Sequence, residues 1–315
     1  MEGLKATSAD VMNCFRLLLG REPHPVEVAG HLSRVGEDLT SVVAAFVNSA
    51  EFESRALANR NYLARIETAD LGTFKLCASP DDAAVGRHAL GGVYEPHVQA
   101  AFRTYVKPGM TVLDVGANIG FFTMLAASLT GPGGFVLAVE PNPANAKLIE
   151  ANKRLNGFEH VRIAQVGAWR NLDLFVLNTD FTNGSVAPAR DNLESLFAAT
   201  TVPVIPLDQL LEPTRRVGLI KIDVEGAEHA ALEGAASLIG RDHPVIISEF
   251  SPHNLAGKSG TGGTEYLTWL VERGYSLSVL EKDGRAVEFG RRIAAVIKAF
   301  DRSGIDHIDI VAIPD

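Results

Sequence analysis

Apolar side chains recur three and four positions apart in the first part of the chain, between Ala9 and Arg55. Val11 and Phe15 show this spacing, and so does the run Val42–Val47. Because an α-helix turns once in about 3.6 residues, the pattern predicts helices that each bury one face. We expect a small all-helical domain over residues 1–60.

A short mixed segment follows at residues 61–106. Residues 62–78 have the pattern of extended or hairpin structure, and Asp81-Asp82 predicts the start of a helix. Gly91-Gly92 predicts a turn, and a further helix is expected over residues 95–105. We interpret this segment as a connecting hairpin and a lead-in helix.

From residue 107 to residue 315, short runs rich in β-branched residues alternate with helical segments. This alternation is typical of a doubly wound α/β sheet, whose parallel strands are buried on both faces. We predict seven strands, with helices between most of them. The predicted strands are Thr111–Val115, Phe135–Val139, Val161–Val166, Leu219–Ile222, Val245–Glu249, Ser276–Leu280 and His307–Ile313.

One stretch departs from this alternation, from Trp169 to Leu207. Apolar and polar residues alternate on both sides of Asn183-Gly184, which predicts strands joined by a turn at these two residues. Loops carried on a rigid sheet commonly determine specificity, so we expect this insertion to contribute to the choice of substrate.

The composition argues against several classes of protein. The 38 acidic and 29 basic residues give a formal net charge of −9, the wrong sign for a protein that tracks a phosphate backbone, so no nucleic-acid partner is expected. Two cysteines, Cys14 and Cys77, are too few for a disulfide framework or a thiolate metal site. No apolar run is long enough for a membrane span, and residues 1–10 lack the pattern of a secretory signal. We therefore expect a cytoplasmic protein.

A glycine-rich turn follows the first predicted strand of the sheet, in Asp114-Val-Gly116-Ala-Asn118-Ile-Gly120. A strand, a glycine turn and a helix in this order let the backbone pass close to a nucleotide cofactor. Glu140 ends the next predicted strand, 24 residues after Gly116, where a carboxylate can accept hydrogen bonds from both ribose hydroxyls. Together these features predict an adenosine site.

Both NAD and S-adenosylmethionine fit such a site. Dinucleotide folds seat a pyrophosphate on three glycines in the order G-x-G-x-x-G, and this turn lacks that set. The carboxylate of Asp114 suits the positively charged amino group or sulfonium of S-adenosylmethionine better than a diphosphate. We predict S-adenosylmethionine as the cofactor. An NAD-linked oxidoreductase or epimerase is the alternative, and a non-enzymatic adaptor is a third hypothesis.

Five segments in this part of the chain resemble the motifs of the FkbM-type methyltransferases, a family of S-adenosylmethionine-dependent O-methyltransferases. The resemblance runs from about Asp82 to the C-terminus and implies a Rossmann-like class I methyltransferase fold, a seven-stranded and mostly parallel doubly wound sheet. The segments are Gly92–Pro96, Val112–Thr123, Ala138–Pro143, Pro206–Asp208 and Ile220–Glu228.

The resemblance also implies which residues bind the cofactor. The glycine turn would hold the methionine part, Glu140 the ribose, and the end of the third strand would border the adenine, while Glu95 would close over the site. The implied cofactor-binding residues are Glu95, Asp114, Gly116, Ala117, Asn118, Gly120, Glu140, Asn142, Gly167, Ala168 and Asp223.

Catalytic candidates follow from the chemistry of methyl transfer to a hydroxyl. The reaction is an in-line displacement that depends on positioning and on a base for the proton of the acceptor. Ligands of an open α/β sheet bind at the carboxyl ends of its strands. The candidates at this edge are Asp223 and Glu225, after the strand Leu219–Ile222, and Glu249 and His253, at and after the end of the next strand. The predicted catalytic residues are Asp223, Glu249 and His253.

Three further polar residues have competing interpretations. Lys221 lies inside a strand, where it needs an acidic partner such as Glu249 or Asp114, and substrate binding is the equal alternative. Glu228 is expected to satisfy amides in the first turn of a helix, and His229 to be solvated or to cap that helix. The acidic cluster would also suit Mg²⁺, but no metal is included in the predicted site.

The N-terminal segments Leu17–Pro23 and Ser49–Phe52 resemble a small helical domain found beside glycosyltransferases. This association implies an acceptor in carbohydrate or surface-glycan assembly. A plain helical docking surface explains the segment equally well. The predicted function is therefore O-methyl transfer to a hydroxyl of a sugar, a glycan or a small metabolite such as a polyketide. The sequence does not indicate the oligomeric state.

Overall fold

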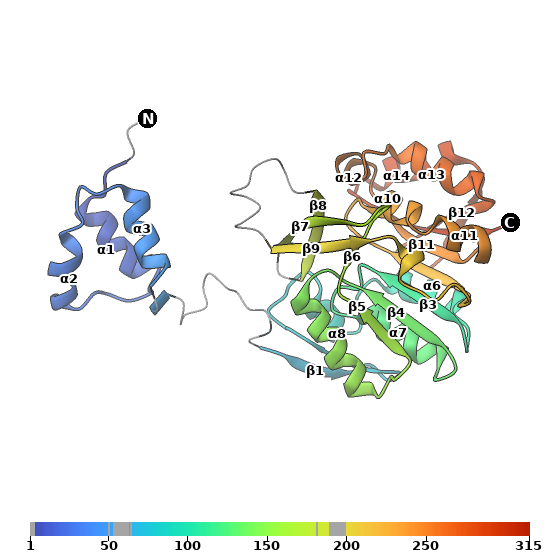
Figure 1. Cartoon of the computed structure of the whole chain (residues 1–315), viewed down its shortest axis with the longest axis horizontal. Coiled ribbons are helices and arrows are strands. Elements are labelled where there is room, and N and C mark those ends of the chain that lie inside the picture. Colours follow the sequence, from blue (N-terminus) through green and yellow to red (C-terminus); the bar gives the residue numbers. More distant parts are fainter. Residues whose placement is uncertain (1–3, 50, 53–62, 64, 181, 189–199) are drawn as a thin grey trace. The chain divides into compact units, whose positions relative to one another are not determined.

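The structure of the chain is a computed structural model that describes residues 4–49, 51–52, 63, 65–180, 182–188 and 200–315. The chain divides into two compact units, Met1–Ala64 and Arg65–Asp315 (Figure 1). The boundary predicted between residues 60 and 61 lies outside the described residues. None of the described helices combines the length and the apolar character needed to cross a membrane.

The first unit has its own hydrophobic core between short helices. The rings of Phe15 and Phe46 meet edge to face with centroids 4.9 Å apart, and Phe52 is buried in the same cluster. The guanidinium of Arg21 binds Glu51 and Glu27, with Nε–Oε1 and Nη1–Oε2 distances of 2.6 and 2.8 Å. The helical pattern of the sequence is confirmed for the described residues. The helices are α1 (Ser8–Leu17), α2 (Pro25–Leu32) and α3 (Leu39–Val47).

The second unit begins with the hairpin and the lead-in helix that the sequence predicts. The helix start predicted at Asp81-Asp82 is wrong, because the carboxylate of Asp82 accepts the backbone N–H groups of Val85 and Gly86 and so shapes the turn ahead of the helix. The elements here are β1 (Glu67–Asp70), β2 (Lys75–Ala78), α5 (Gly86–Leu90) and α6 (Pro96–Tyr105).

A mixed sheet forms the centre of the second unit. Five of its eight strands, β11, β10, β3, β4 and β5, run parallel to one another, whereas β14 is antiparallel to both β11 and β12. In the order of the sheet the strands are β13 (Ala286–Gly290), β12 (Tyr275–Leu280), β14 (Ile308–Pro314), β11 (Val245–Phe250), β10 (Leu219–Ile222), β3 (Thr111–Val115), β4 (Phe135–Val139) and β5 (Val161–Ala164).

The doubly wound α/β fold is confirmed, with one more strand than predicted. The extra strand, β13, pairs with β12 at the edge of the sheet, and its side chains are exposed or half-buried. An edge strand without a buried face lacks the apolar alternation from which strands are predicted, so the pattern gave no signal for it.

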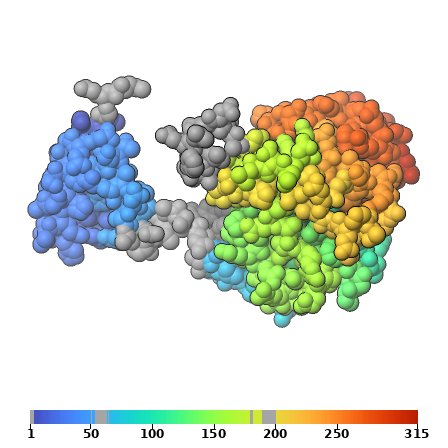
Figure 2. Space-filling model, in the orientation of Figure 1, coloured from blue at the N-terminus to red at the C-terminus, as the bar shows by residue number. Residues whose placement is uncertain are grey.

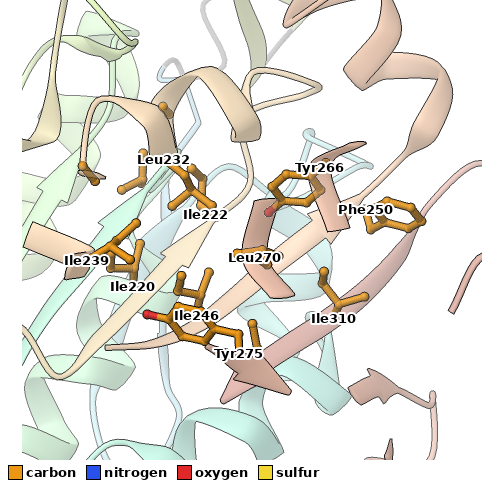
Figure 3. Packing of buried hydrophobic residues seen from close by; sticks show 14 of the residues in the cluster. Ile220, Ile222, Leu232, Ile239, Ile246, Phe250, Tyr266, Leu270, Tyr275 and Ile310 are labelled. Carbon is orange, nitrogen blue, oxygen red and sulfur yellow. The ribbon is translucent and has the colours of Figure 1, made fainter. Parts of the chain in front are cut away.

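Helices cover both faces of the sheet because successive side chains of each buried strand point to opposite faces. Ile220 and Ile222 of β10 pack toward α10, α11 and α13, beside Tyr266 (Figure 3). Lys221, between them, points to the other face, where its Nζ lies 5.3 Å from the ring centroid of Phe122 on α7. The remaining helices are α7 (Phe121–Thr130), α8 (Pro143–Asn156), α10 (Glu228–Glu233), α11 (Ala236–Asp242), α12 (Pro252–Lys258), α13 (Gly263–Glu272) and α14 (Ile293–Ser303).

The insertion forms a second, small sheet, as its alternation predicts. Together with α8, this sheet makes up part of the surface shown in Figure 2. The turn predicted at Asn183-Gly184 is wrong, because these residues already pair with the preceding strand, Asn183 opposite Asp180. The strands are β6 (Gly167–Ala168), β7 (Asp173–Asp180), β8 (Asn183–Pro188) and β9 (Thr200–Ile205).

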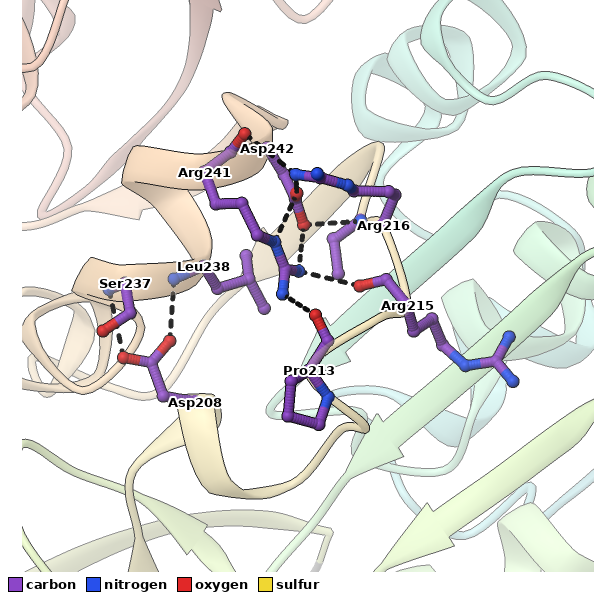
Figure 4. Close-up of polar contacts among 9 residues, drawn as sticks. Asp208, Pro213, Arg215, Arg216, Ser237, Leu238, Arg241 and Asp242 are labelled. Carbon is purple, nitrogen blue, oxygen red and sulfur yellow. Dashed lines mark hydrogen bonds and ion pairs between the residues drawn. The ribbon is translucent and has the colours of Figure 1, made fainter.

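Asp208 fastens the end of the small sheet to α11. Its carboxylate accepts the backbone N–H groups of Ser237 and Leu238 at 3.0 and 2.9 Å (Figure 4). From the same helix, Arg241 donates to the carbonyls of Pro213 and Arg215, just before β10. The motif around Asp208 therefore has a structural role, since it anchors the chain that leads into β10.

Replacing Asp208 by alanine is expected to lower the free energy of unfolding of the second unit by about 1 kcal/mol, the usual effect of losing a side chain that caps a helix. Urea denaturation followed by circular dichroism measures the change. The matched control is Glu212→Ala, an exposed acid in the same loop. Equal losses in the two variants would contradict the capping role.

Candidate functional site

A cavity of about 220 Å³ lies at the carboxyl ends of β3, β4 and β10. In an open α/β sheet this edge is where ligands bind, because the loops that follow neighbouring strands diverge there. The walls come from the glycine turn, the end of β4, the β6 region, the start of β8 and the loop after β10. The residues that line it and were candidates from the sequence are Glu95, Gly116, Asn118, Glu140, Gly167, Ala168, Asp223, Glu225 and Glu249.

Gly116 forms the floor of this cavity. Its φ of 77° lies in the left-handed region, and a Cβ atom there would come within 1.8 Å of the carbonyl oxygen of Asp223. Only glycine lets the turn after β3 approach the loop after β10 this closely. The missing side chain also leaves the backbone of the turn open to a ligand.

Two buried oxygen atoms beside this turn lack a hydrogen-bond partner among the described residues. They are Oδ1 of Asp114 and Oδ1 of Asn118. The other oxygen of Asp114 accepts the hydroxyl of Thr123 at 2.6 Å, and burial raises the pKa of the Asp114 carboxyl. Unpaired buried acceptors are costly, so their position is suited to a ligand that carries a donor or a positive charge.

Glu140 links the glycine turn to the start of α8. Its two carboxylate oxygens each accept a backbone N–H at 2.8 Å, from Asn118 and from Asn142. The side chain is 5% exposed, and burial raises its pKa to about 7 against the opposing effect of these hydrogen bonds. A carboxylate has further acceptor sites, so Glu140 can still bind hydroxyl groups in the cavity.

The small sheet covers the cavity on the side of the glycine turn. Asn118 donates to the side chain of Asn183 at 3.2 Å, and the hydroxyl of Thr182 donates to Asp82 at 2.5 Å. Farther along β8, Ser185 accepts from Lys258 of α12 at 3.1 Å. The insertion is therefore attached at three points around the cavity.

Lys221 and two acids occupy the next part of the edge. Nζ of Lys221 lies 3.1 Å from Oδ2 of Asp223, and the lysine side chain is 6% exposed. Lys221 therefore forms its ion pair with Asp223, an acid that was not expected as its partner. Of the two expected partners, Asp114 acts on Lys221 through its charge, since it raises the pKa of the lysine, and Glu249 is wrong. Burial opposes the charge on Asp223, but Lys221 and a hydrogen bond from Glu249 outweigh it and lower the pKa of Asp223.

The carboxyl group of Glu249 is hydrogen-bonded to Asp223 of this pair. Burial, and then the nearby charge of Asp223, raise the pKa of Glu249 to about 11. Asp223 is thus ionised and Glu249 protonated at neutral pH. Among the described residues, no group of three or more His, Cys, Asp or Glu side chains is arranged to hold a metal ion.

Glu95 stands at the N-terminus of α6, with its backbone in the left-handed region at φ 43°. Burial raises the pKa of its carboxyl to about 7, although Lys221 acts in the opposite direction. Its side chain hydrogen-bonds Tyr94, which also lines the cavity. The strained backbone points to a position that the surrounding packing holds in place.

Several predicted residues lie behind the cavity wall. Asp114 and Ala117 are buried beneath it, Asn142 caps α8 through Ala144, and a Cβ at Gly120 would come within 3.0 Å of Ile149. These positions shape the turn and its packing on α8, and they are not among the residues that line the cavity.

Two predictions about histidines are wrong. His253 lies exposed in the first turn of α12 rather than in a loop, and it does not line the cavity. His229 is 4% exposed rather than solvated, and its Nδ1 lies 2.8 Å from the hydroxyl of Thr261. Glu228, by contrast, accepts the N–H groups of Val224 and Gly226, as expected for an acid that satisfies amides.

Residues from distant segments were missed. Tyr94, Thr182 and His307 line the cavity. The hydrophobic patterns next to these residues do not indicate that their segments lie at the carboxyl edge of the sheet. The antiparallel direction of β14 brings His307 there, since the residue just before an antiparallel strand lies at the carboxyl ends of its parallel neighbours.

Residues 114–277, about half of the chain, match the family model described as the methyltransferase FkbM domain. With the doubly wound sheet and the glycine turn after β3, this match makes the protein an S-adenosylmethionine-dependent methyltransferase with a Rossmann-like class I fold. More particularly, the chain belongs to the FkbM methyltransferase family. The match decides between the two cofactors in favour of S-adenosylmethionine.

Individual proteins with similar sequences or structures are more distant. A protein-L-isoaspartate O-methyltransferase of Caenorhabditis elegans is 28% identical over 169 residues, which are 51% of this chain and 71% of that protein. The crystal structure of an FkbM methyltransferase from Methylobacillus flagellatus KT aligns with a TM-score of 0.40 and 15% identity, over 97% of this chain and 60% of that chain. Aeropyrum pernix fibrillarin with bound S-adenosyl-L-methionine aligns with a TM-score of 0.38 and 16% identity, over 69% of this chain and 73% of that one.

Proposed function

We propose that the protein transfers the methyl group of S-adenosylmethionine to a hydroxyl oxygen of a glycan or small-molecule acceptor. The observation that carries this proposal is a second cavity beside the first. Glu95 and His307 line both cavities. A cofactor and an acceptor bound side by side would meet at this junction, where titratable groups are available to accept a proton.

The residues of the first cavity fit the cofactor. Glu140 would bind the ribose hydroxyls, the backbone at Gly116 would lie along the cofactor, and the unpaired oxygen of Asn118 would accept from its ammonium group, with the buried carboxyl of Asp114 behind it. When bound, S-adenosylmethionine supplies an electrophilic methyl group on positively charged sulfur. Lys221 keeps Asp223 ionised, so this carboxylate would accept a hydrogen bond from the acceptor hydroxyl and orient its oxygen toward the methyl group.

A sugar or glycan acceptor is supported by association. The N-terminal motifs that resemble a domain found beside glycosyltransferases converge in the first unit, through the contacts of Arg21 with Glu51 and the burial of Phe52. We propose this unit as a docking module of that kind. Transfer to oxygen agrees with the description of the C. elegans relative as an O-methyltransferase.

The experiment that tests the function uses the full chain, S-adenosylmethionine labelled in its methyl group, and a panel of 4-nitrophenyl glycosides. We expect a product with one labelled methyl ether on a sugar hydroxyl, identified by mass spectrometry. Label on nitrogen or carbon of other acceptors, with none on the glycosides, would contradict transfer to a sugar hydroxyl.

Replacing Asp223 by asparagine is expected to lower kcat about a hundredfold while changing cofactor affinity little, because one preorganised charge in an active site contributes roughly 10²–10³ in rate. Initial rates and calorimetry measure the two effects. The pH dependence of kcat should keep its shape. Glu228→Gln is the control, and an equal loss of turnover there would mean that Asp223 is a structural acid.

A further inference from the structure

The second cavity has the size of a small-molecule site. Its volume of about 710 Å³ lies within the range of roughly 300–1,000 Å³ that such sites occupy. It is bounded by the start of α6, the end of β12, α14 and the loop before β14. Leu280, Phe289 and Ile308 give it apolar walls, and Lys282 and Arg302 add positive charge. These walls suit an acceptor with an apolar body and polar substituents.

A histidine–aspartate pair lines this cavity. Nε2 of His97, in the first turn of α6, lies 2.6 Å from Oδ2 of Asp309 on β14, and the two side chains are 15% and 16% exposed. Asp309 is opposite Glu249 in the sheet register, so the pair adjoins the acids of the first cavity. Neither residue was a candidate from the sequence, because they are 212 positions apart.

The contact with Asp309 determines which nitrogen of His97 is available. With Nε2–H donating to the carboxylate, Nδ1 carries the lone pair. Among the described residues, Nδ1 has no hydrogen-bond partner. The neutral ring can therefore accept a proton from a group bound in the cavity.

Two acids of the first cavity, Asp223 and Glu249, are poorly suited to that task. Lys221 lowers the pKa of Asp223 against the effect of burial, which makes this carboxylate a weak base. Glu249 already holds a proton at neutral pH, since burial and Asp223 raise its pKa to about 11. A base that is free of its proton near neutral pH is needed for an alcohol.

We propose that His97, held by Asp309, is the general base for an acceptor hydroxyl bound in the second cavity. This inference rests on the proposed O-methyl transfer. The acceptor O–H bond breaks and its proton goes to Nδ1 of His97. A C–O bond forms between the acceptor oxygen and the methyl carbon, and the methyl–sulfur bond breaks with its electron pair going to sulfur. Asp309 is a positioning residue.

The charges around His97 set the pH at which it works. The hydrogen bond to Asp309 raises the pKa of His97, burial opposes this, and Glu95 and Lys282 act in opposite directions. On the other walls, Glu281 after β12, Arg302 of α14, and Asp306 and His307 before β14 also line the cavity. A base must be neutral, so kcat should rise with pH through a His97 pKa that lies above the ordinary value.

The test compares full-length variants with labelled S-adenosylmethionine and the 4-nitrophenyl glycosides. His97→Gln keeps an N–H for Asp309 but removes the base, and it should lower kcat about a hundredfold, within the range of roughly 10²–10⁴ for general-base catalysis. Cofactor affinity, measured by calorimetry, should stay unchanged, and kcat should lose its rise with pH. His88→Gln, an exposed histidine of α5, should behave as wild type.

Asp309→Asn supplies a measurement that does not depend on turnover. We expect the titration of the His97 ring, followed by NMR, to move to lower pH, and the rise of kcat to move with it. An unchanged kcat in His97→Gln, or an unchanged His97 titration in Asp309→Asn, would overturn this inference alone. A wild-type protein that binds the cofactor but methylates no hydroxyl would overturn the proposed function and this inference with it.

Discussion

Replacing Glu140 by alanine is expected to weaken binding of S-adenosylmethionine by more than tenfold, as measured by isothermal titration calorimetry. Glu140 lines the cavity and holds the N–H groups of Asn118 and Asn142, so the change removes both a ligand contact and the link that positions the glycine turn. A hydrogen bond to a charged group contributes about 1.5–3 kcal/mol, which is roughly ten- to hundredfold in affinity.

The pH dependence of binding provides a sharper test of this carboxylate. Because the pKa of Glu140 is raised to about 7, its ionised form, the stronger acceptor for ribose hydroxyls, becomes populated as the pH passes upward through that value. Wild-type affinity should therefore rise with pH in this range, and Glu140→Gln should lose the rise. Glu159→Ala, an exposed acid after α8, is the control. Unchanged affinity in Glu140→Ala would show that the ribose lies elsewhere.

Replacing Lys221 by methionine is expected to lower the free energy of unfolding of the second unit by about 3–5 kcal/mol, the effect of breaking a buried ion pair by removing one partner. Lys221 is almost fully buried and lies close enough to Asp223, Asp114 and Glu95 for all three to raise its pKa, against the opposing effect of burial. Methionine has a similar length but leaves these acids without their cation.

The pH dependence distinguishes this electrostatic role from packing. Asp223 has a lowered pKa in the native protein, so its contribution is present above its ordinary pKa and is lost as the pH falls. Without Lys221 the remaining acids take up protons more readily, so the deficit of the variant should be largest at neutral pH and should shrink on acidification. Urea denaturation at several pH values measures it.

The control for this variant is Lys298→Met on α14, which removes an exposed lysine. A double-mutant cycle with Asp223→Asn adds a second check, since residues in direct contact should show a coupling energy. A deficit that is the same at every pH, with no coupling, would mean that Lys221 acts through packing alone.

The proposed functional residues follow the order of the strands along the carboxyl edge of the sheet. Glu140 and Gly116 follow β4 and β3, Asp223 follows β10, Glu249 is the last residue but one of β11, and Asp309 lies opposite it on β14. The proposed cofactor site thus occupies the half of the edge with the parallel strands β3 and β4, and the proposed acceptor site the half that includes β14 and β12. The two proposed sites lie side by side because the start of the antiparallel strand β14 is at the same edge as the carboxyl ends of the parallel strands.

Much of this arrangement could be predicted from local pattern. Strands buried on both faces are continuous apolar runs, so Thr111–Val115 and Leu219–Ile222 were predicted with the bounds that the structure has. The glycine turn and Glu140 were recognisable because the loop and the strand end of the proposed adenosine site lie within one β–α–β unit, at a spacing that local geometry fixes.

Features that depend on pairing between distant segments could not be predicted in this way. The exposed strand β13 and the first turn of α12 at His253 carry no amphipathic signal, and the partner of Lys221 depends on the direction in which three buried side chains point. The burial of His229 against Trp269 likewise depends on α13, a separate helix.

The sequence alone determined the alternation of strands and helices, the glycine turn and the acid that follows the second strand of the sheet, because these depend on periodicity and on contacts between near neighbours. Only the tertiary structure decided which acid Lys221 neutralises, that Glu249 keeps its proton, and that His97 meets Asp309 beside a second cavity. Those outcomes depend on burial and on charges brought together from distant segments, and neither is encoded in local spacing.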